Sequence, residues 1–153
     1  MNFYTPYAIL HTVYTYMDCI FCKIISREIP ANIVYEDDFS LAFLDINPIN
    51  IGHALLLPKE HYENIFDISE ELLAKLSVNS KRLALAVKKS LNADGVNVIS
   101  NNGHASGQLV FHAHIHIIPR YDDDGFTHWK GKRGYNDGEA KEVAGKIKTA
   151  LGE

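Results

Sequence analysis

The sequence predicts an α+β domain, with an antiparallel sheet, one long helix and shorter flanking helices. Two observations predict this class: short apolar runs separated by turn-forming residues, and one long stretch of helical periodicity. The 153 residues correspond to one domain, and 46% hydrophobic with 22% charged residues is typical of soluble globular proteins. A chain of this length can bury a proper core.

The first half of the chain contains one short helix and three short strands. A short helical turn is expected at 20–26. It ends before Pro30, because a proline disfavours helical geometry in the residue ahead of it. Strands are expected at 33–35 and 41–44, joined by a polar hairpin turn at 36–38. After a loop marked by Pro48, Asn50 and Gly52, a fully apolar strand covers 54–57 and ends at Pro58.

The second half contains the long helix and the most informative strand. Apolar residues between 69 and 91 recur at helical spacing, and Gly95 lies just beyond the expected end of this helix. Strands are expected at 96–100 and 109–118, on either side of the glycine-rich loop 101–107. From about Asp137 an amphipathic helix is expected, packed on the domain or on a partner chain.

The N-terminal residues 1–16 form an uncertain extension, rich in tyrosine and without lysine or arginine. They lack the basic start of a secretory signal, so Met17 is a plausible true start, and a docked edge strand is the alternative. Residues 17–153 are then one domain, expected in the cytoplasm. No apolar stretch is long enough to span a membrane, and two cysteines cannot form a disulfide framework.

Charge and histidine content narrow the classes of function. A net charge of −4 argues against a nucleic-acid binder that relies on bulk charge. Eight histidines are the unusual feature, and three of them alternate in His112-Ala113-His114-Ile115-His116. In a strand these three share one face, with rings roughly 6.5–7 Å apart. The pattern indicates a site of nucleophilic or acid–base chemistry, a strand-borne metal site, or an exposed face that happens to carry histidine.

This segment resembles the signature of the histidine-triad (HIT) family of nucleotide hydrolases and transferases, in which three histidines alternate with apolar residues. Other blocks resemble that family in the same order, over about Met17 to Arg120: 18–24, 41–46, 52–55, 58–61, and 101–103 leading to 107–108. The resemblance implies a HIT-like fold and a homodimer.

The resemblance also implies a reaction at the α-phosphate of a nucleotide. His114 is then the nucleophile that forms a covalent nucleotidyl-histidine, and water completes the hydrolysis. One nitrogen of a neutral imidazole can attack only if a neighbour holds the proton on the other, and His116 or a backbone carbonyl is the candidate. His112 completes the triad, and His53 supports it from an adjacent strand.

Further positions carry expected contacts with the substrate. The family register implies Gln108 and Asn101 at the phosphate, Asp45 at the ribose hydroxyls, and Phe43 with Ile46 at the base. The loop from Gly103 to Gly107 can turn N–H groups toward an anion. Leu109 departs from the family, because many relatives carry serine or threonine there. Taken alone, Asp45 and Asn101 are also ordinary turn residues.

The pair Cys19-x-x-Cys22 is ambiguous by itself between a redox pair, a metal site and two buried thiols. Bacterial-type members of the family supply two more ligands, and their pattern implies a structural zinc on Cys19, Cys22, His61 and His112. His104 is expected to be an exposed loop residue, His11 and His128 to be incidental, and Trp129 to be a weak candidate for substrate contact.

The sequence therefore predicts a hydrolase of purine nucleoside monophosphate derivatives, such as a phosphoramidate or an acyl-adenylate. Three alternatives stay open. These are a dinucleoside polyphosphate hydrolase, a zinc-stabilised nucleotide-binding module with little turnover, and a metallohydrolase whose triad holds a catalytic metal.

Overall fold

The computed structural model describes residues 18–127, 131 and 133–152. The expectations for residues 1–16, Met17, His128 and Trp129 lie outside the described residues.

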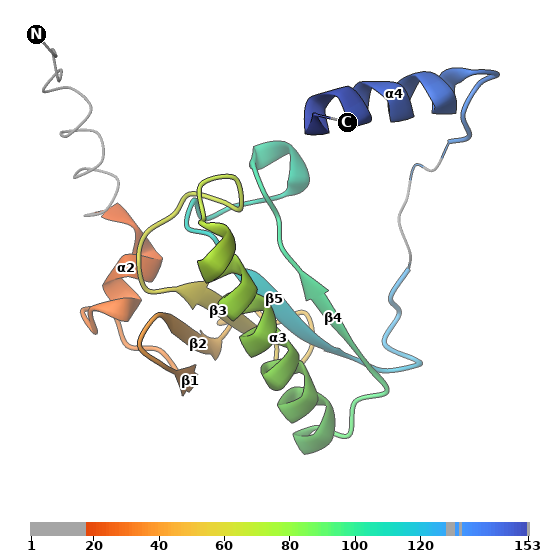
Figure 1. Cartoon of the computed structure of the whole chain (residues 1–153). Coiled ribbons are helices and arrows are strands. Elements are labelled where there is room, and N and C mark those ends of the chain that lie inside the picture. Colours follow the sequence, from red (N-terminus) through yellow and green to blue (C-terminus); the bar gives the residue numbers. More distant parts are fainter. Residues whose placement is uncertain (1–17, 128–130, 132, 153) are drawn as a thin grey trace, which may run out of the picture.

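A five-stranded antiparallel sheet forms the centre of the molecule (Figure 1). Its spatial order is β1-β2-β3-β5-β4, and every neighbouring pair is antiparallel. The strands are β1 (Ile33–Glu36), β2 (Ser40–Leu44), β3 (Ala54–Pro58), β4 (Gly95–Ile99) and β5 (Ile115–Arg120). This sheet, with its helices, confirms the predicted α+β class.

Two helices cover opposite faces of the sheet. Strand side chains alternate between the faces, so each face presents apolar residues that a helix can cover. The short helix α2 (Ile20–Ile25) places Phe21 and Ile24 against Leu41, Phe43, Leu55 and Leu57. The long helix α3 (Glu70–Ser90) places Leu76 and Leu83 against Ala42, Ala54, Leu56 and Ile117 on the other face. Ser69 caps α3, since its hydroxyl accepts a hydrogen bond from the Leu72 N–H.

The strand expected at 109–118 begins later, at Ile115, so that prediction was wrong for its first six residues. The partners set this limit: Leu56 pairs with Ile115, and Ile99 at the end of β4 pairs with His116. Before Ile115 the chain is held by other contacts, such as the Ala113 N–H donating to the Tyr62 carbonyl. His112 and His114 therefore precede the strand, and only His116 lies in it.

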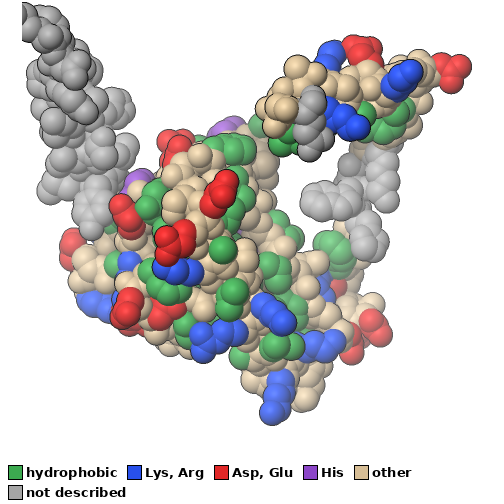
Figure 2. Space-filling model, viewed as in Figure 1, with side chains coloured by type: hydrophobic (Ala, Val, Ile, Leu, Met, Phe, Trp, Pro, Cys, Tyr) green, Lys and Arg blue, Asp and Glu red, His purple; other side chains and the backbone are tan. Residues whose placement is uncertain are grey.

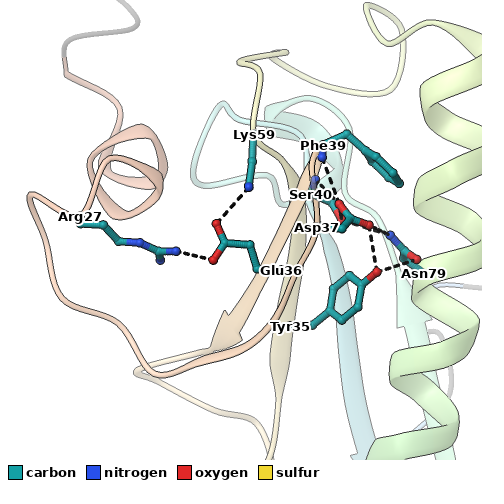
Figure 3. A network of polar contacts seen from close by, with 8 residues as sticks. All are labelled: Arg27, Tyr35, Glu36, Asp37, Phe39, Ser40, Lys59 and Asn79. Atoms are coloured by element: carbon teal, nitrogen blue, oxygen red, sulfur yellow. Dashed lines mark hydrogen bonds and ion pairs between the residues drawn. The ribbon is translucent and has the colours of Figure 1, made fainter.

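A polar network ties the β1–β2 turn to α3 (Figure 3). The Asp37 carboxylate accepts hydrogen bonds from the turn residues Phe39 and Ser40, and from Tyr35 and the Asn79 amide of α3. Asn79 is 3% exposed, so its side chain depends on these partners. The hairpin that carries Phe43 is thus fixed to the long helix by directed bonds as well as by apolar packing.

The C-terminal helix α4 (Glu139–Leu151) buries none of its described side chains and stands away from the sheet in Figure 1. It was expected to pack on the domain or on a partner chain, and the structure shows no burial against the domain. In Figure 2, acidic and basic side chains are mixed over α4, whereas α3 carries acidic residues in its first turn and basic residues in its last turn. Among the described residues, none of the helices combines the length and the apolar character needed to cross a bilayer.

Candidate active site and metal centre

His114 lies against Phe21 of α2, beside the apolar core on that face of the sheet, and is 6% exposed. Its Nδ1 lies 2.6 Å from the backbone carbonyl oxygen of His112. A carbonyl only accepts, so His114 carries its proton on Nδ1 and donates it to that oxygen. The lone pair of Nε2 is left for chemistry. Of the two candidates from the sequence, the backbone carbonyl holds the tautomer.

A second chain of hydrogen bonds sets the proton of His116. The Ile49 N–H donates to Nδ1 of His53, 3.3 Å away, so that nitrogen is unprotonated. The proton of neutral His53 is therefore on Nε2, which donates to Nδ1 of His116 over 2.9 Å. His116 in turn keeps its proton on Nε2. The His116 ring centroid lies 4.9 Å from that of His114, closer than the spacing expected for a regular strand.

Asp45 lies beside this pair at the end of β2. Its Oδ1 accepts a hydrogen bond from the Asn47 N–H, which is the turn-capping role considered from the sequence. Its Oδ2 lies 3.7 Å from Nδ1 of His53. The carboxylate is one-fifth exposed, at 21%, so it remains accessible from outside the core.

Burial keeps the triad neutral. It is the largest cause of the lowered pKa of His114, opposed by the hydrogen bond to the His112 carbonyl and by Asp45. Burial, followed by His114 and His53, lowers the pKa of His116 to about 4. The pKa of His53 is also lowered by burial, while Asp45 acts in the opposite direction. Neutral imidazoles are what the two hydrogen-bond assignments require.

The glycine loop is more internally bonded than the sequence suggested. The N–H groups of Gly103, Ser106, Gly107 and Gln108 all donate within the loop. Gln108 is 1% exposed, and its amide donates to the carbonyls of Glu63 and Val110 while accepting from Gly103. In this conformation Gln108 holds the loop together, so contact with a phosphate would require an exchange of these bonds.

The other expected substrate contacts differ in their exposure. The Asn101 side chain lies against Gly107, 3.8 Å from where a Cβ would be. Leu109 and Ile46 are each 87% exposed, whereas Phe43 is buried. His104 is exposed in the loop, as expected.

Phe21 is a site residue that the sequence reasoning missed. Its ring packs edge-on against His114, with centroids 5.2 Å apart, and against Phe43 at 5.5 Å. An aromatic residue between two cysteines carries no signal of its own, and only the docking of α2 on the sheet reveals the contact.

A second cluster brings together Cys19, Cys22, His61 and His112. Cys22 Sγ lies 3.3 Å from Nδ1 of His61 and 3.5 Å from Nδ1 of His112, and Cys19 Sγ lies 3.5 Å from the same His112 nitrogen. Tetrahedral zinc, with Zn–S near 2.3 Å and Zn–N near 2.05 Å, separates sulfur from nitrogen by about 3.6 Å. The donor types and their spacing therefore fit a Cys₂His₂ zinc site.

The surroundings of His112 also fit this interpretation. Its Nε2 donates to the Pro58 carbonyl over 2.9 Å, which leaves Nδ1 unprotonated and directed at the sulfurs. Burial lowers the pKa of His112 to about 4, and burial with the adjacent Cys19 raises the pKa of the Cys22 thiol to about 12. A divalent cation would supply the charge that makes the thiolate stable there. His112 thus contributes its ring to the candidate metal cluster and its carbonyl to the candidate active site.

Comparison with known proteins identifies the family. The HIT domain family model matches residues 26–123, and the chain belongs to this family. Among relatives, it is 52% identical over 107 residues to an uncharacterised HIT-like protein of Methanocaldococcus jannaschii, covering 70% of this chain and 82% of that one. It is 43% identical over 107 residues to an adenylylsulfatase of Arabidopsis thaliana, covering 70% of this chain and 54% of that one.

Solved structures agree with this assignment. A crystal structure of a Streptococcus mutans protein matches with a TM-score of 0.82 at 39% identity, covering 88% of this chain and 85% of that one. A zinc-bound histidine triad family protein from Mycobacterium smegmatis matches with a TM-score of 0.70 at 34% identity, covering 88% and 98%.

Proposed function

We propose that this protein is a nucleotide hydrolase that acts at the α-phosphate of purine nucleoside monophosphate derivatives through a nucleotidyl-His114 intermediate. One observation carries the proposal. The His112 carbonyl holds the proton of His114 on Nδ1, and the hydrogen bond from His53 leaves the proton of His116 on Nε2. A lone pair and an N–H donor thus stand side by side, as nucleophilic displacement requires.

In the first step, Nε2 of His114 attacks the phosphorus and the bond to the leaving group breaks. The leaving group departs with the electron pair and takes the Nε2 proton of His116, which becomes an imidazolate beside the positively charged phosphoimidazolium of His114. In the second step, the oxygen of a water molecule attacks the phosphorus, and the same water gives a proton to His116. The phosphorus–nitrogen bond then breaks, nucleoside monophosphate is released, and both histidines return to their initial state.

The proposed substrates are adenosine phosphoramidates or acyl-adenylates. An Arabidopsis relative named an adenylylsulfatase supports a mixed derivative of adenylate as substrate. The partly exposed carboxylate of Asp45 suits the ribose hydroxyls, because a carboxylate can accept from both. Phe43, Ile46, Asn101, Gly107, Gln108 and Leu109 complete the proposed substrate contacts.

We also propose zinc as a resident structural ion on Cys19, Cys22, His61 and His112. The match to a zinc-bound structure of the family supports this assignment. The ion would join α2 to the segment before β5 and so fix both Phe21 and the His112 carbonyl. It would lie beside the reaction rather than in it, since His114 is not among these four residues and His116 belongs to a separate group with Asp45 and His53.

The proposed assembly is a homodimer in the cytoplasm. Strand β4 lies at one edge of the sheet and offers backbone groups for pairing with the same strand of a second copy. Neither cysteine forms a disulfide, which suits a reducing compartment. Size-exclusion chromatography with light scattering tests the dimer.

The decisive experiment detects the intermediate. Zinc-loaded protein is mixed with adenosine 5′-phosphoramidate, quenched in base, and weighed intact by mass spectrometry. An adenylyl adduct is expected in the wild type and absent in His114→Ala, while His104→Ala, an exposed loop control, keeps it. Equal turnover in wild type and His114→Ala would exclude this mechanism. Faster cleavage of a dinucleoside polyphosphate than of the phosphoramidate would indicate a dinucleoside polyphosphate hydrolase. Binding without turnover would indicate a nucleotide-binding module.

A further inference from the structure

The proton on His116 depends on a competition at one nitrogen of His53. The Ile49 N–H donates to Nδ1 of His53 at 3.3 Å, and the Asp45 carboxylate lies 3.7 Å from the same nitrogen. These neighbours demand opposite states, because an N–H needs an unprotonated Nδ1 whereas a carboxylate needs a protonated one. In this structure the Ile49 donor is within hydrogen-bond distance and the carboxylate is beyond it.

The outcome of that competition decides what His116 can do. With Nδ1 of His53 unprotonated, His53 donates to His116 and leaves a proton on Nε2 of His116. If His53 instead donated to Asp45, its Nε2 would accept from Nδ1 of His116. The outer nitrogen of His116 would then be bare and could not protonate a leaving group.

Asn50, the residue after Ile49 in the same loop, is held by three hydrogen bonds. The Asn50 carbonyl accepts from the His53 N–H over 3.0 Å. The Asn50 side-chain amide donates to the Pro119 carbonyl at 2.9 Å and to the Asp124 carboxylate at 2.8 Å. Both partners lie about 70 residues away in sequence, at the end of β5 and in the turn that follows.

Asp124 is itself held from several sides. It accepts from the N–H groups of Tyr121 and Phe126 and from the Arg120 guanidinium, at 2.6 Å for the last. Arg120 also lies over the Phe126 ring, 4.2 Å from its centroid. The anchor for Asn50 is therefore a rigid, charged turn rather than a mobile side chain.

We infer that Asn50 is a positioning residue for catalysis, which through the Ile49 N–H selects the His53 tautomer that makes His116 a proton donor. The inference rests on the proposed function, in which His116 protonates the leaving group. Asn50 touches no substrate in this scheme. Loss of the anchor to Asp124 frees the loop, so the Ile49 N–H no longer occupies Nδ1 of His53. Nδ1 then carries the proton and donates a hydrogen bond to Asp45.

The first test varies the leaving group. Adenylylation of Asn50→Ala by an alkyl phosphoramidate, whose amine must be protonated to leave, is expected to fall about 30-fold. Adenylylation by the p-nitrophenyl ester of adenylate, whose leaving group needs no proton, is expected to change less than about threefold. Ile51→Ala, an exposed residue of the same loop, serves as the control and should leave both rates unchanged. Equal losses for both substrates, or no loss for either, would overturn the inference.

The second test reads the tautomer directly in the ligand-free, zinc-loaded protein. Histidine ¹⁵N NMR is expected to show His53 protonated on Nε2 in the wild type and on Nδ1 in Asn50→Ala. An unchanged His53 tautomer would overturn the inference even if Asn50→Ala were slow. Failure of the proposed function has a different signature, since no adenylyl-His114 would form in the wild type while the tautomer result would stand.

Discussion

Replacing Asp37 by asparagine should lower the free energy of unfolding by about 2 kcal/mol at pH 7. Burial alone would raise the pKa of Asp37, but hydrogen bonds from Ser40, Tyr35 and Asn79 outweigh it and lower the pKa from 3.8 to about 2. Each pKa unit corresponds to about 1.4 kcal/mol, which yields about 2.5 kcal/mol, and the partial solvent exposure of Asp37 reduces this to about 2 kcal/mol. The amide introduced by Asp37→Asn would also direct an NH₂ group at the NH₂ group of Asn79, where the carboxylate now accepts.

The pH dependence of this loss follows from its sign. The folded state lowers the pKa of Asp37, so the stabilisation is fully present above about pH 4 and disappears as the pH falls toward 2. Urea unfolding of wild type and Asp37→Asn, compared at pH 7 and again at pH 3, measures it. Asp38→Asn, an exposed neighbour in the same turn, should change stability by less than about 0.5 kcal/mol. A difference between wild type and Asp37→Asn that is absent at pH 7, or equal at both pH values, would refute the reasoning.

Three further predictions concern the metal and the histidines. Chelation, or Cys22→Ser, should remove bound zinc and lower the melting temperature, and an unchanged melting temperature with full zinc loss would contradict a structural role. Burial, His114 and His53 lower the pKa of His116 to about 4, against the opposing effect of Asp45. Protonation of His116 should therefore not reduce kcat/KM until the pH falls well below 6.5. A pH–rate profile checks this, and an acid limb at 6.5 assigned to His116 would contradict it. His53→Ala should slow adenylylation about 100-fold, while His53→Gln, whose amide can still donate to His116, should slow it less. Stopped-flow assays measure both rates, and equal losses of rate would argue against the donor role.

Local patterns in the sequence were sufficient for most of the secondary structure. The helical repeat of leucines predicted α3 to within a residue at each end, and the apolar run before Pro58 predicted β3. These signals are short-range, because they depend on which residues share a face over two or three turns or pleats. The four proposed metal ligands, inferred from family resemblance, do lie together in the structure.

The start of β5 could not be read in this way. The alternation of His112, His114 and His116 looks like one continuous strand, but a strand also needs partners, and those offered by β3 and β4 begin only at Ile115 and His116. Gln108 shows the same limit, since its amide bonds to Glu63, a residue far away in the chain.

The sequence by itself determined the α+β class, the order of the elements and the set of histidines and cysteines available for chemistry. Only the tertiary structure decided which nitrogen of each histidine carries the proton. That choice depends on the acceptor or donor that folding brings to the other nitrogen: the His112 carbonyl for His114, and the Ile49 N–H for His53. The loop of Ile49 is in turn tied through Asn50 to Asp124, and no periodicity in the sequence reports a contact across 74 residues.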